Sequence, residues 1–292
     1  MTVEILAQVF VNAIVLSLIY VLMALGLTLV FSIMSMINFA HGEIYMLGAF
    51  AVYYLFDQWH FSYVWALIAS MVLSAIAGLF LERFIFRPLR GKPGFILASC
   101  LASLGVGLMI ASAAQLVFGE KDNDVSTVVS GVLKLGTVVF SYEKLLVVVI
   151  GIVLTIALIL LIRYSKLGHA LQAIAQDRDA AALMGININR LNAIGFALAS
   201  ALAGAAGGLI APLFFISPYM GDDVVLKAFI IVILGGLGSL PGAVLAGFIL
   251  GFVDSFGLTL IGYSANIIGF SIVIIFLIFR HRGLLGREFR VH

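Results

Sequence analysis

The chain has 292 residues, of which 63% are hydrophobic and only 10% are charged, and its mean hydropathy is +1.23. A soluble domain needs far more charge to cover its surface, so the composition excludes that class. Unbroken apolar runs such as LLVVVIGIVLTIALILLI at 145–162 are too long for the short alternating strands of a membrane β-barrel. We therefore expect an all-α polytopic membrane protein.

Apolar segments in chain order predict about eight transmembrane segments in a single transmembrane domain covering 1–292. They lie at 5–35, 39–57, 62–82, 95–118, 143–162, 191–217, 224–258 and 262–280. The first and seventh are too long for one simple helix. Broken or re-entrant helices are predicted near 36–43, where a polar turn falls, and near 234–242, which reads LGGLGSLPG. Such breaks are tolerated in a membrane only where they are buried or line a cavity.

The distribution of basic residues predicts the orientation of the spans, because cytoplasmic connections collect Lys and Arg. Two connections and the C-terminal tail hold Arg83, Arg87, Arg90, Lys92, Arg163, Lys166, Arg178, Arg190, Arg280, Arg282, Arg287 and Arg290. The remaining Lys121, Lys134, Lys144 and Lys227 are mixed with acids, and we place them outside. This assignment puts the C-terminus in the cytoplasm and the N-terminus outside, unless the first segment is a hairpin.

Several polar residues interrupt the apolar segments, namely Asn12, Asn38, His41, Glu43, Gln115, Asp254 and Asn266. Ionisable residues in spans usually face the bundle interior or a water-filled path. We expect a translocation path or gate at Asn38, His41, Glu43 and Asp254 and at the glycine-rich break, Gly235, Gly236 and Gly238. The alternative at the first site is structural: Asn38 caps a helix whose first turn is followed by Glu43.

The connection at 163–190 is the longest polar stretch that we place in the cytoplasm. Its Ala-, Leu- and Gln-rich middle favours a helix, and Gly185 stands where a left-handed residue ends one. A passive linker with a solvated charge cluster at Asp177, Arg178 and Asp179 is one interpretation. The other is a helix that docks in a groove of a partner.

The segment DAAALMG at 179–185 resembles the EAA loop of ABC-importer membrane subunits, with Asp179 where that family usually has Glu. In that family the helix before the glycine seats in a cleft of the ATP-binding subunit. The resemblance therefore implies an ATPase-coupling segment at about 163–190, with contacts from Asp177, Arg178, Asp179, Ala180, Ala181 and Gly185.

Longer stretches extend the resemblance over nearly the whole chain. They are GLTLVFSIMSMINFAHGEIYMLGAF at 26–50, RPLRGKP at 87–93, LGHALQAIAQDRDAAALMGININRL at 167–191 and FIIVILGGLGSLPGAVLAGFILG at 229–251. Together they are similar to the LivH type of branched-chain amino acid ABC-importer permease. The resemblance implies a bacterial inner-membrane permease that works with a second homologous permease, two cytoplasmic ATPases and an extracytoplasmic substrate-binding protein. Urea-type ABC permeases share much of the pattern, so the cargo stays open.

No cofactor is expected on this chain. The sequence contains no G-x-x-x-x-G-K-[ST] loop to hold nucleotide phosphates, so ATP and magnesium are expected on the partner ATPases. The five histidines show no metal-binding spacing, and we expect neither a metal site nor an enzyme. We also expect contact with membrane lipids, and we expect no nucleic-acid partner. The competing hypothesis is an ion-coupled secondary transporter or channel, in which His41, Glu43 and Asp254 are the coupling sites.

Overall fold

The protein is described by a computed structural model, which covers residues 3–135, 138–262, 271 and 283–286. Its elements in chain order are α1 (Val3–Met34), α2 (His41–Val52), the π-helix η1 (Tyr53–Gln58), α3 (Tyr63–Leu81), the π-helix η2 (Glu82–Phe86), α4 (Arg87–Leu89), α5 (Phe95–Phe118), β1 (Val132–Leu135), β2 (Val138–Ser141), α6 (Tyr142–Tyr164), α7 (Lys166–Gln176), α8 (Arg178–Leu183), α9 (Ile188–Ile210), α10 (Met220–Gly235) and α11 (Leu240–Ile261).

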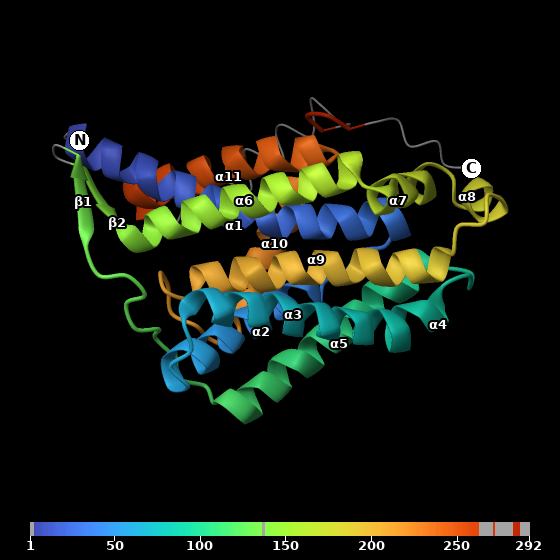
Figure 1. Cartoon of the computed structure of the whole chain (residues 1–292), viewed down its shortest axis with the longest axis horizontal. Helices are drawn as coiled ribbons and strands as arrows, with labels where there is room; N and C mark the ends of the chain where they lie inside the picture. Colours follow the sequence, from blue (N-terminus) through green and yellow to red (C-terminus); the bar gives the residue numbers. More distant parts are fainter. Residues whose placement is uncertain (1–2, 136–137, 263–270, 272–282, 287–292) are drawn as a thin grey trace.

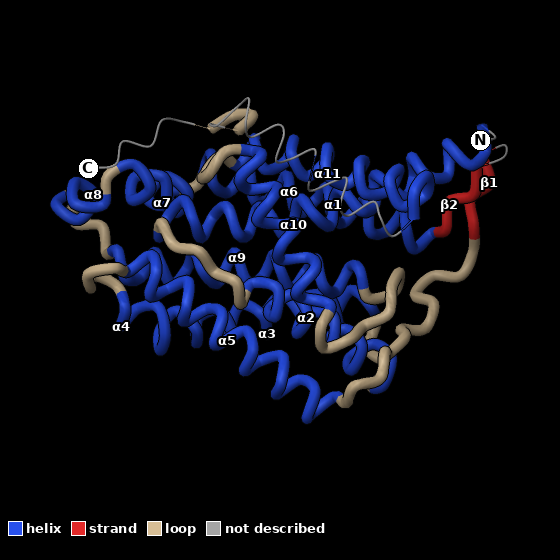
Figure 2. Tube along the Cα trace, turned by 180° about the vertical axis from the view of Figure 1, so that it is seen from behind, coloured by secondary structure: helices blue, strands red, loops and turns tan. Residues whose placement is uncertain are grey.

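The long helices run along one axis of the molecule (Figure 1). One side is formed by α1, α6 and α11, and the other by α2, α3, α5 and α9, while α10 touches both α11 and α2. The antiparallel β1–β2 hairpin lies at the end where the chain begins, and α4, α7 and α8 lie at the opposite end. Figure 2 shows the same arrangement from behind, with most loops near the two ends of the helices and one loop inside the bundle beside α9.

Six helices in the described residues are long and apolar enough to cross a membrane. They confirm the prediction of an all-α polytopic membrane protein, but they do not confirm a count of eight. The segment predicted at 39–57 is the shorter pair α2 and η1, and the segment at 224–258 is the pair α10 and α11. The segment predicted at 262–280 and the tail arginines lie almost wholly outside the described residues.

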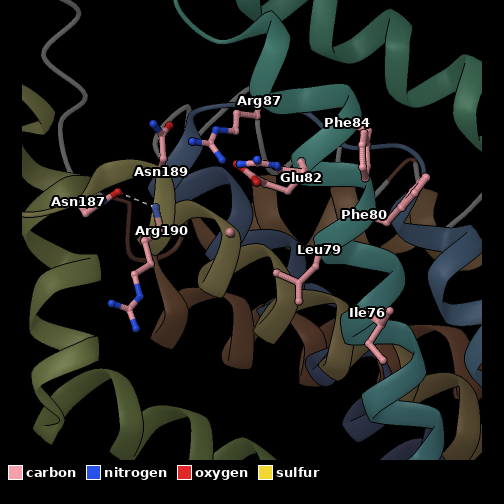
Figure 3. Close-up of a pocket in the computed structure, with 11 residues that line it drawn as sticks. Ile76, Leu79, Phe80, Glu82, Phe84, Arg87, Asn187, Asn189 and Arg190 are labelled. Atoms are coloured by element: carbon pink, nitrogen blue, oxygen red, sulfur yellow. Dashed lines mark hydrogen bonds between the residues drawn. The ribbon is translucent and has the colours of Figure 1, made fainter.

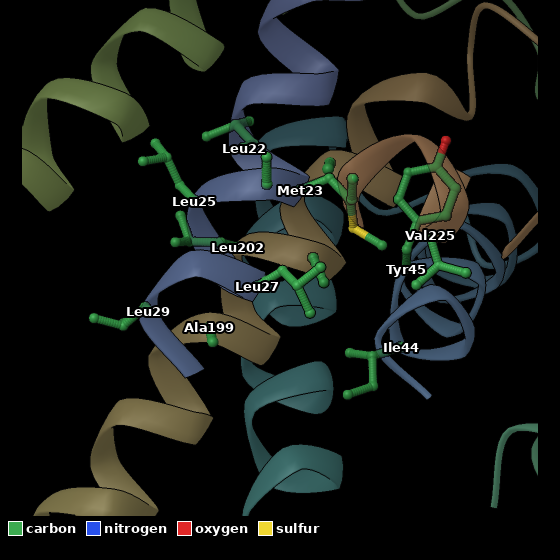
Figure 4. Close-up of a cluster of buried hydrophobic side chains, with 14 of the residues drawn as sticks. Leu22, Met23, Leu25, Leu27, Leu29, Ile44, Tyr45, Ala199, Leu202 and Val225 are labelled. Carbon is green, nitrogen blue, oxygen red and sulfur yellow. The ribbon is translucent and has the colours of Figure 1, made fainter. Parts of the chain in front are cut away.

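The first segment is one continuous helix, so the expectation that it was too long for a simple helix is wrong. Helix α1 has 32 residues, which is a length of about 48 Å. It contains no proline, and 83% of its most apolar window is buried. A helix that is apolar all round is stable when neighbours surround it, and α1 contacts α6, α9, α10 and α11. Figure 4 shows Leu22, Met23 and Leu27 of α1 within this core.

Glycines let α2 and α9 approach closely enough for their backbones to touch. A Cβ added to Gly48 would lie 2.5 Å from the Cα of Gly204, and one added to Gly207 would collide with the carbonyl oxygen of Tyr45. Small residues at membrane helix interfaces allow this contact. The α2–α9 interface therefore depends on the absence of side chains at these positions.

We expect Gly48→Ala to lower the apparent melting temperature in detergent, because the added methyl forces the two backbones apart at a cost of about 1–3 kcal/mol. The matched control is Gly105→Ala on α5, where an added Cβ meets nothing within 4 Å. There the gain in helix propensity stabilises by up to about 1 kcal/mol. Equal melting temperatures for the two variants would show that the α2–α9 contact is not close.

Candidate functional site

The first break in the helices lies between Met34 and His41. Ser35 adopts the left-handed conformation with φ of +51° directly after α1, and α2 begins at His41. The backbone N–H of Phe39 donates to the Ser103 hydroxyl of α5 at 3.0 Å. A side-chain acceptor from another helix thus satisfies a backbone donor inside the bundle, which is how broken membrane helices are tolerated.

The prediction that Asn38 caps α2 is wrong. The capping position is occupied by Ala40, which makes no side-chain cap, whereas Glu43 does lie in the first turn. Asn38 is fully buried, and neither atom of its side-chain amide has a hydrogen-bond partner among the described residues. Burial of an unsatisfied amide is costly. The Asn38 amide therefore has unused donors and an unused acceptor for a hydrogen bond with a water or a solute.

His41 is buried against α1 at Gly26. A Cβ added to Gly26 would lie 2.8 Å from His41 Nε2 and 2.7 Å from the carbonyl oxygen of Ala199. Gly26 therefore provides the space in which the imidazole fits between α1 and α9. This contact gives His41 a role in joining three helices, which no local pattern in the sequence shows.

Helix α10 begins beside the start of α2. A Cβ on Gly221 would lie 2.5 Å from the carbonyl oxygen of Gly42. A Cβ on Gly42 would likewise collide with the carbonyl oxygen of Gly221. The rings of Phe39 and Phe229 lie 4.7 Å apart on the same interface. Two helix N-termini thus meet inside the bundle, and each carries an acid in its first turn, which the positive end of a helix dipole favours.

The second break separates α10 from α11. Gly236 and Gly238 take positive φ values of 101° and 81°, and a Cβ on Gly235 would collide with Gly242 at the start of α11. Ser239 caps α11 by accepting from the Gly242 N–H at 3.2 Å. These glycines lie at the opposite end of α10 from Gly221, about 21 Å along the helix, so they are not beside the Asn38–Glu43 turn.

Asp254 belongs to a buried polar cluster between α1, α10 and α11. Lys227 Nζ donates to Asp254 Oδ2 at 2.6 Å and to the Tyr20 hydroxyl at 2.9 Å, and Tyr20 donates to Asp254 Oδ2 at 2.8 Å. The Lys227 and Asp254 side chains are only 16% and 8% exposed. The placement of Lys227 in an external connection is therefore wrong, because the buried carboxylate needs this counter-charge.

The sequence did contain a signal for this pair. Lys227 is the only basic residue between Arg190 and Arg280, and Asp254 lies in the apolar run of α11. A buried acid in a membrane span usually pairs with a base, so Lys227 was the nearest available partner. No equivalent signal exists for Tyr20 or Gly221, since neither residue type is unusual in a membrane helix.

The predicted coupling segment consists of two short helices rather than one. Asp177 ends α7 and caps α8 by accepting from the backbone N–H groups of Asp179 and Ala180, both at 2.9 Å. Gly185 ends the segment with φ of +82°, as its position predicts. Ala181 is buried, whereas Ala180, Leu183 and Met184 face solvent.

Arg178 is half-buried at the base of α8. Burial first, and then the positive charge of Arg90, lower the pKa of the Arg178 guanidinium from its usual value. A guanidinium stays charged under such conditions. Arg178 therefore presents a positive charge at the foot of the helix pair, beside the connection between α4 and α5.

A bundle of membrane-length helices with shorter helices that begin inside it is the architecture of a polytopic transport protein. The model of the family described as "Branched-chain amino acid transport system / permease component" matches residues 9–280, and the chain belongs to this family.

The relatives agree with this assignment over almost their full lengths. The permease protein BraD of a high-affinity branched-chain amino acid transport system in Pseudomonas aeruginosa is 34% identical and covers 96% of this chain and 95% of its own. The corresponding LivH proteins of Escherichia coli K12 and Salmonella typhimurium are 30% and 31% identical, and each covers 97% of this chain and 96% of its own. The chain is a multi-pass permease of the inner membrane.

The Lys227–Asp254 pair makes a testable prediction about stability. Lys227→Met leaves a buried carboxylate unpaired and is expected to cost about 3–5 kcal/mol of unfolding free energy. Asp254→Asn leaves the ammonium unpaired with a similar loss. The double variant removes both charges and keeps an acceptor for Tyr20, so we expect it to be more stable than either single variant. Denaturant titration in detergent measures all three, and strictly additive losses would contradict a buried ion pair.

Proposed function

We propose that the chain is one permease subunit of an ABC importer for branched-chain amino acids, and that it forms part of the translocation path. The cargo is proposed from the printed names of the relatives. A second, homologous permease would complete the path, two cytoplasmic ATPases would drive it, and an extracytoplasmic binding protein would deliver the cargo. ATP and magnesium would be bound by the ATPases. No cofactor is expected on this chain.

The α7–α8 helix pair is the observation that carries the proposal. Its tip exposes Leu183 and Met184, which are 89% and 83% exposed, between a capped helix start at Asp177 and a left-handed glycine at Gly185. Exposed apolar side chains on a rigid helix fit the groove of a partner protein. A passive linker would need neither the cap nor the apolar tip.

The orientation that we propose follows from the two ends of the molecule. The end with α4, α7 and α8 carries Arg83, Arg87, Arg90, Arg163 and Lys166, and we place it in the cytoplasm. The β1–β2 hairpin and the start of α1 would then lie outside. The C-terminus is proposed to be cytoplasmic on the sequence alone.

A mechanical route leads from α8 to the proposed path. Helix α9 begins at Ile188, three residues after Gly185, so a displacement of α8 acts directly on the end of α9. Helix α9 touches α2 at Gly48 and Gly204, and α2 begins at His41. Because close-packed helices transmit displacement, closure of the ATPases would move the α2–α10 junction.

We propose the α2–α10 junction as the gate, with Asn38, His41 and Glu43 facing the path at some stage of the cycle. Asn38 and Glu43 each retain a buried polar atom without a hydrogen-bond partner among the described residues. Gly235, Gly236 and Gly238 would act as the hinge at the other end of α10. Asp254 would act through Lys227 by holding α10 in register.

The docking proposal predicts a specific loss of association. Leu183→Glu with Met184→Glu is expected to abolish co-purification with the ATPase subunits, because charge replaces the apolar tip, while membrane insertion is unchanged. Gln176→Glu is the matched control, since it adds a negative charge to an exposed position at the end of α7. Affinity purification followed by quantitative mass spectrometry gives the readout. Normal ATPase recovery with the double variant would rule out docking through this tip.

Reconstituted transport tests the cargo. We expect the full complex with ATP to take up radiolabelled leucine, isoleucine and valine into proteoliposomes, and to take up none without ATP. Uptake of urea instead would indicate that the chain is a urea-type permease. Uptake by this chain alone, driven by a proton gradient, would contradict an ABC importer and support a secondary transporter.

A further inference from the structure

A pocket of about 530 Å³ lies between the end of α3 and the start of α9 (Figure 3). Its lining combines two kinds of side chain. Ile76, Leu79, Phe80 and Phe84 form an apolar wall, and the basic residues of the lining are Arg83, Arg87 and Arg190. The pocket lies at the end of the apolar span Tyr63–Leu89, where a membrane surface would lie.

An ion pair and a hydrogen bond of Arg90 hold together two elements that line the pocket. Arg90 donates to Glu82 Oε1 at 2.6 Å and to Asn189 Oδ1 at 2.9 Å, which joins η2 to the start of α9. The Arg90 and Glu82 side chains are 8% and 1% exposed. The acid that lines the pocket is therefore neutralised within the protein, and it does not oppose an anion.

The basic residues that line the pocket form no ion pair among the described residues. Within the described residues the ion pairs are Arg90–Glu82 and Lys227–Asp254, so none of Arg83, Arg87 and Arg190 belongs to one. Asn187 accepts from the backbone N–H of Arg190 at 3.0 Å, the contact dashed in Figure 3, which fixes the backbone from which Arg190 extends. The Arg190 side chain extends away from Arg87 in Figure 3, so Arg83 and Arg87 are the basic groups left to face the hollow.

We propose that this pocket binds an anionic phospholipid, with the headgroup phosphate between Arg83 and Arg87 and an acyl chain along the apolar wall. Ile76, Phe80 and Phe84 are 56%, 59% and 63% exposed. The apolar face continues up α3 through Val72 and Leu73, as an acyl chain requires. Basic pockets between helices at the cytoplasmic surface favour anionic headgroups, and the orientation proposed above places this pocket there.

A lipid explains the pocket better than a free anion or an acidic protein segment. A free phosphate uses the guanidiniums and leaves the apolar wall unexplained. An acidic segment of a protein uses the charged rim but does not reach along α3 into the span. Only an amphipathic ligand with a negative head matches both halves of the lining.

Native mass spectrometry of the delipidated full complex tests the proposal with dioleoylphosphatidylglycerol as the probe and dioleoylphosphatidylcholine as the neutral comparison. We expect tight retention of the glycerol lipid and weaker retention of the choline lipid. In Arg83→Gln/Arg87→Gln, affinity for the anionic lipid should fall roughly 25-fold, since each basic residue contributes about fivefold. Arg163→Gln is the matched control at the same end of the molecule, outside the pocket, and should bind as the unmodified complex does.

The single variant Arg87→Gln keeps the test valid if the double variant fails to assemble, and it should lose roughly fivefold. Inorganic phosphate at the same concentration should not displace the lipid. Equal retention of both lipids, unchanged binding by Arg87→Gln, or full displacement by phosphate would each overturn the proposal. Loss of a partner subunit with unchanged lipid binding would also overturn it, because it would identify the pocket as a protein contact.

Discussion

The close approach of helix backbones at both ends of α10 is the constraint on which the rest of the structure depends. This helix has only 16 residues, and it begins and ends within the bundle. At its start Gly221 touches Gly42, and at its end Gly235 touches Gly242. In apolar surroundings each free backbone N–H or C=O group needs a hydrogen-bond partner. The missing side chains of these glycines leave space for such partners. The N–H groups of Leu284 and Leu285 supply two of them, because they donate to the carbonyls of Leu234 and Gly235.

The glycine contacts do not prevent α10 from sliding or rotating, and buried charges supply that restraint. A helix held only by backbone contact can slide or rotate, because van der Waals contact has little direction. The Lys227–Asp254 pair and the Tyr20 hydroxyl tie the middle of α10 to α11 and α1 with directional bonds. The cost of separating buried charges then opposes rotation. A helix with glycine contacts at both ends and an ionic anchor between them is suited to a small number of discrete positions.

Helix α9 connects the proposed docking surface, the proposed gate and the proposed lipid pocket. Helix α9 starts beside α8, lines the pocket with Arg190 and touches α2 at Gly204. A lipid held between α3 and α9 would oppose their separation. If α8 moves α9 during transport, the lipid composition of the membrane would then influence the cycle through the same contact.

The amino-acid sequence by itself determined the class of fold, the position of both helix breaks and the left-handed end at Gly185. These features follow from local causes, namely apolar length, the polar turn at 36–43, the backbone freedom of glycine and the missing donor of proline. The resemblance of long motifs was also sufficient to indicate the family. Apolar length was misleading at α1, because a fully surrounded helix can exceed the thickness of the membrane.

Tertiary structure alone decided which residues meet. Capping a helix was the structural alternative for Asn38, but its amide instead lies buried with no hydrogen-bond partner among the described residues, since the chain reaches α2 through Ala40. Lys227 was expected outside and instead neutralises Asp254, 27 positions further on. The His41 imidazole packs against Gly26, and the backbones of Gly221 and Gly42 touch. Each of these pairs joins separate helices, and the register between helices arises from packing over their whole length, which no short stretch of sequence specifies.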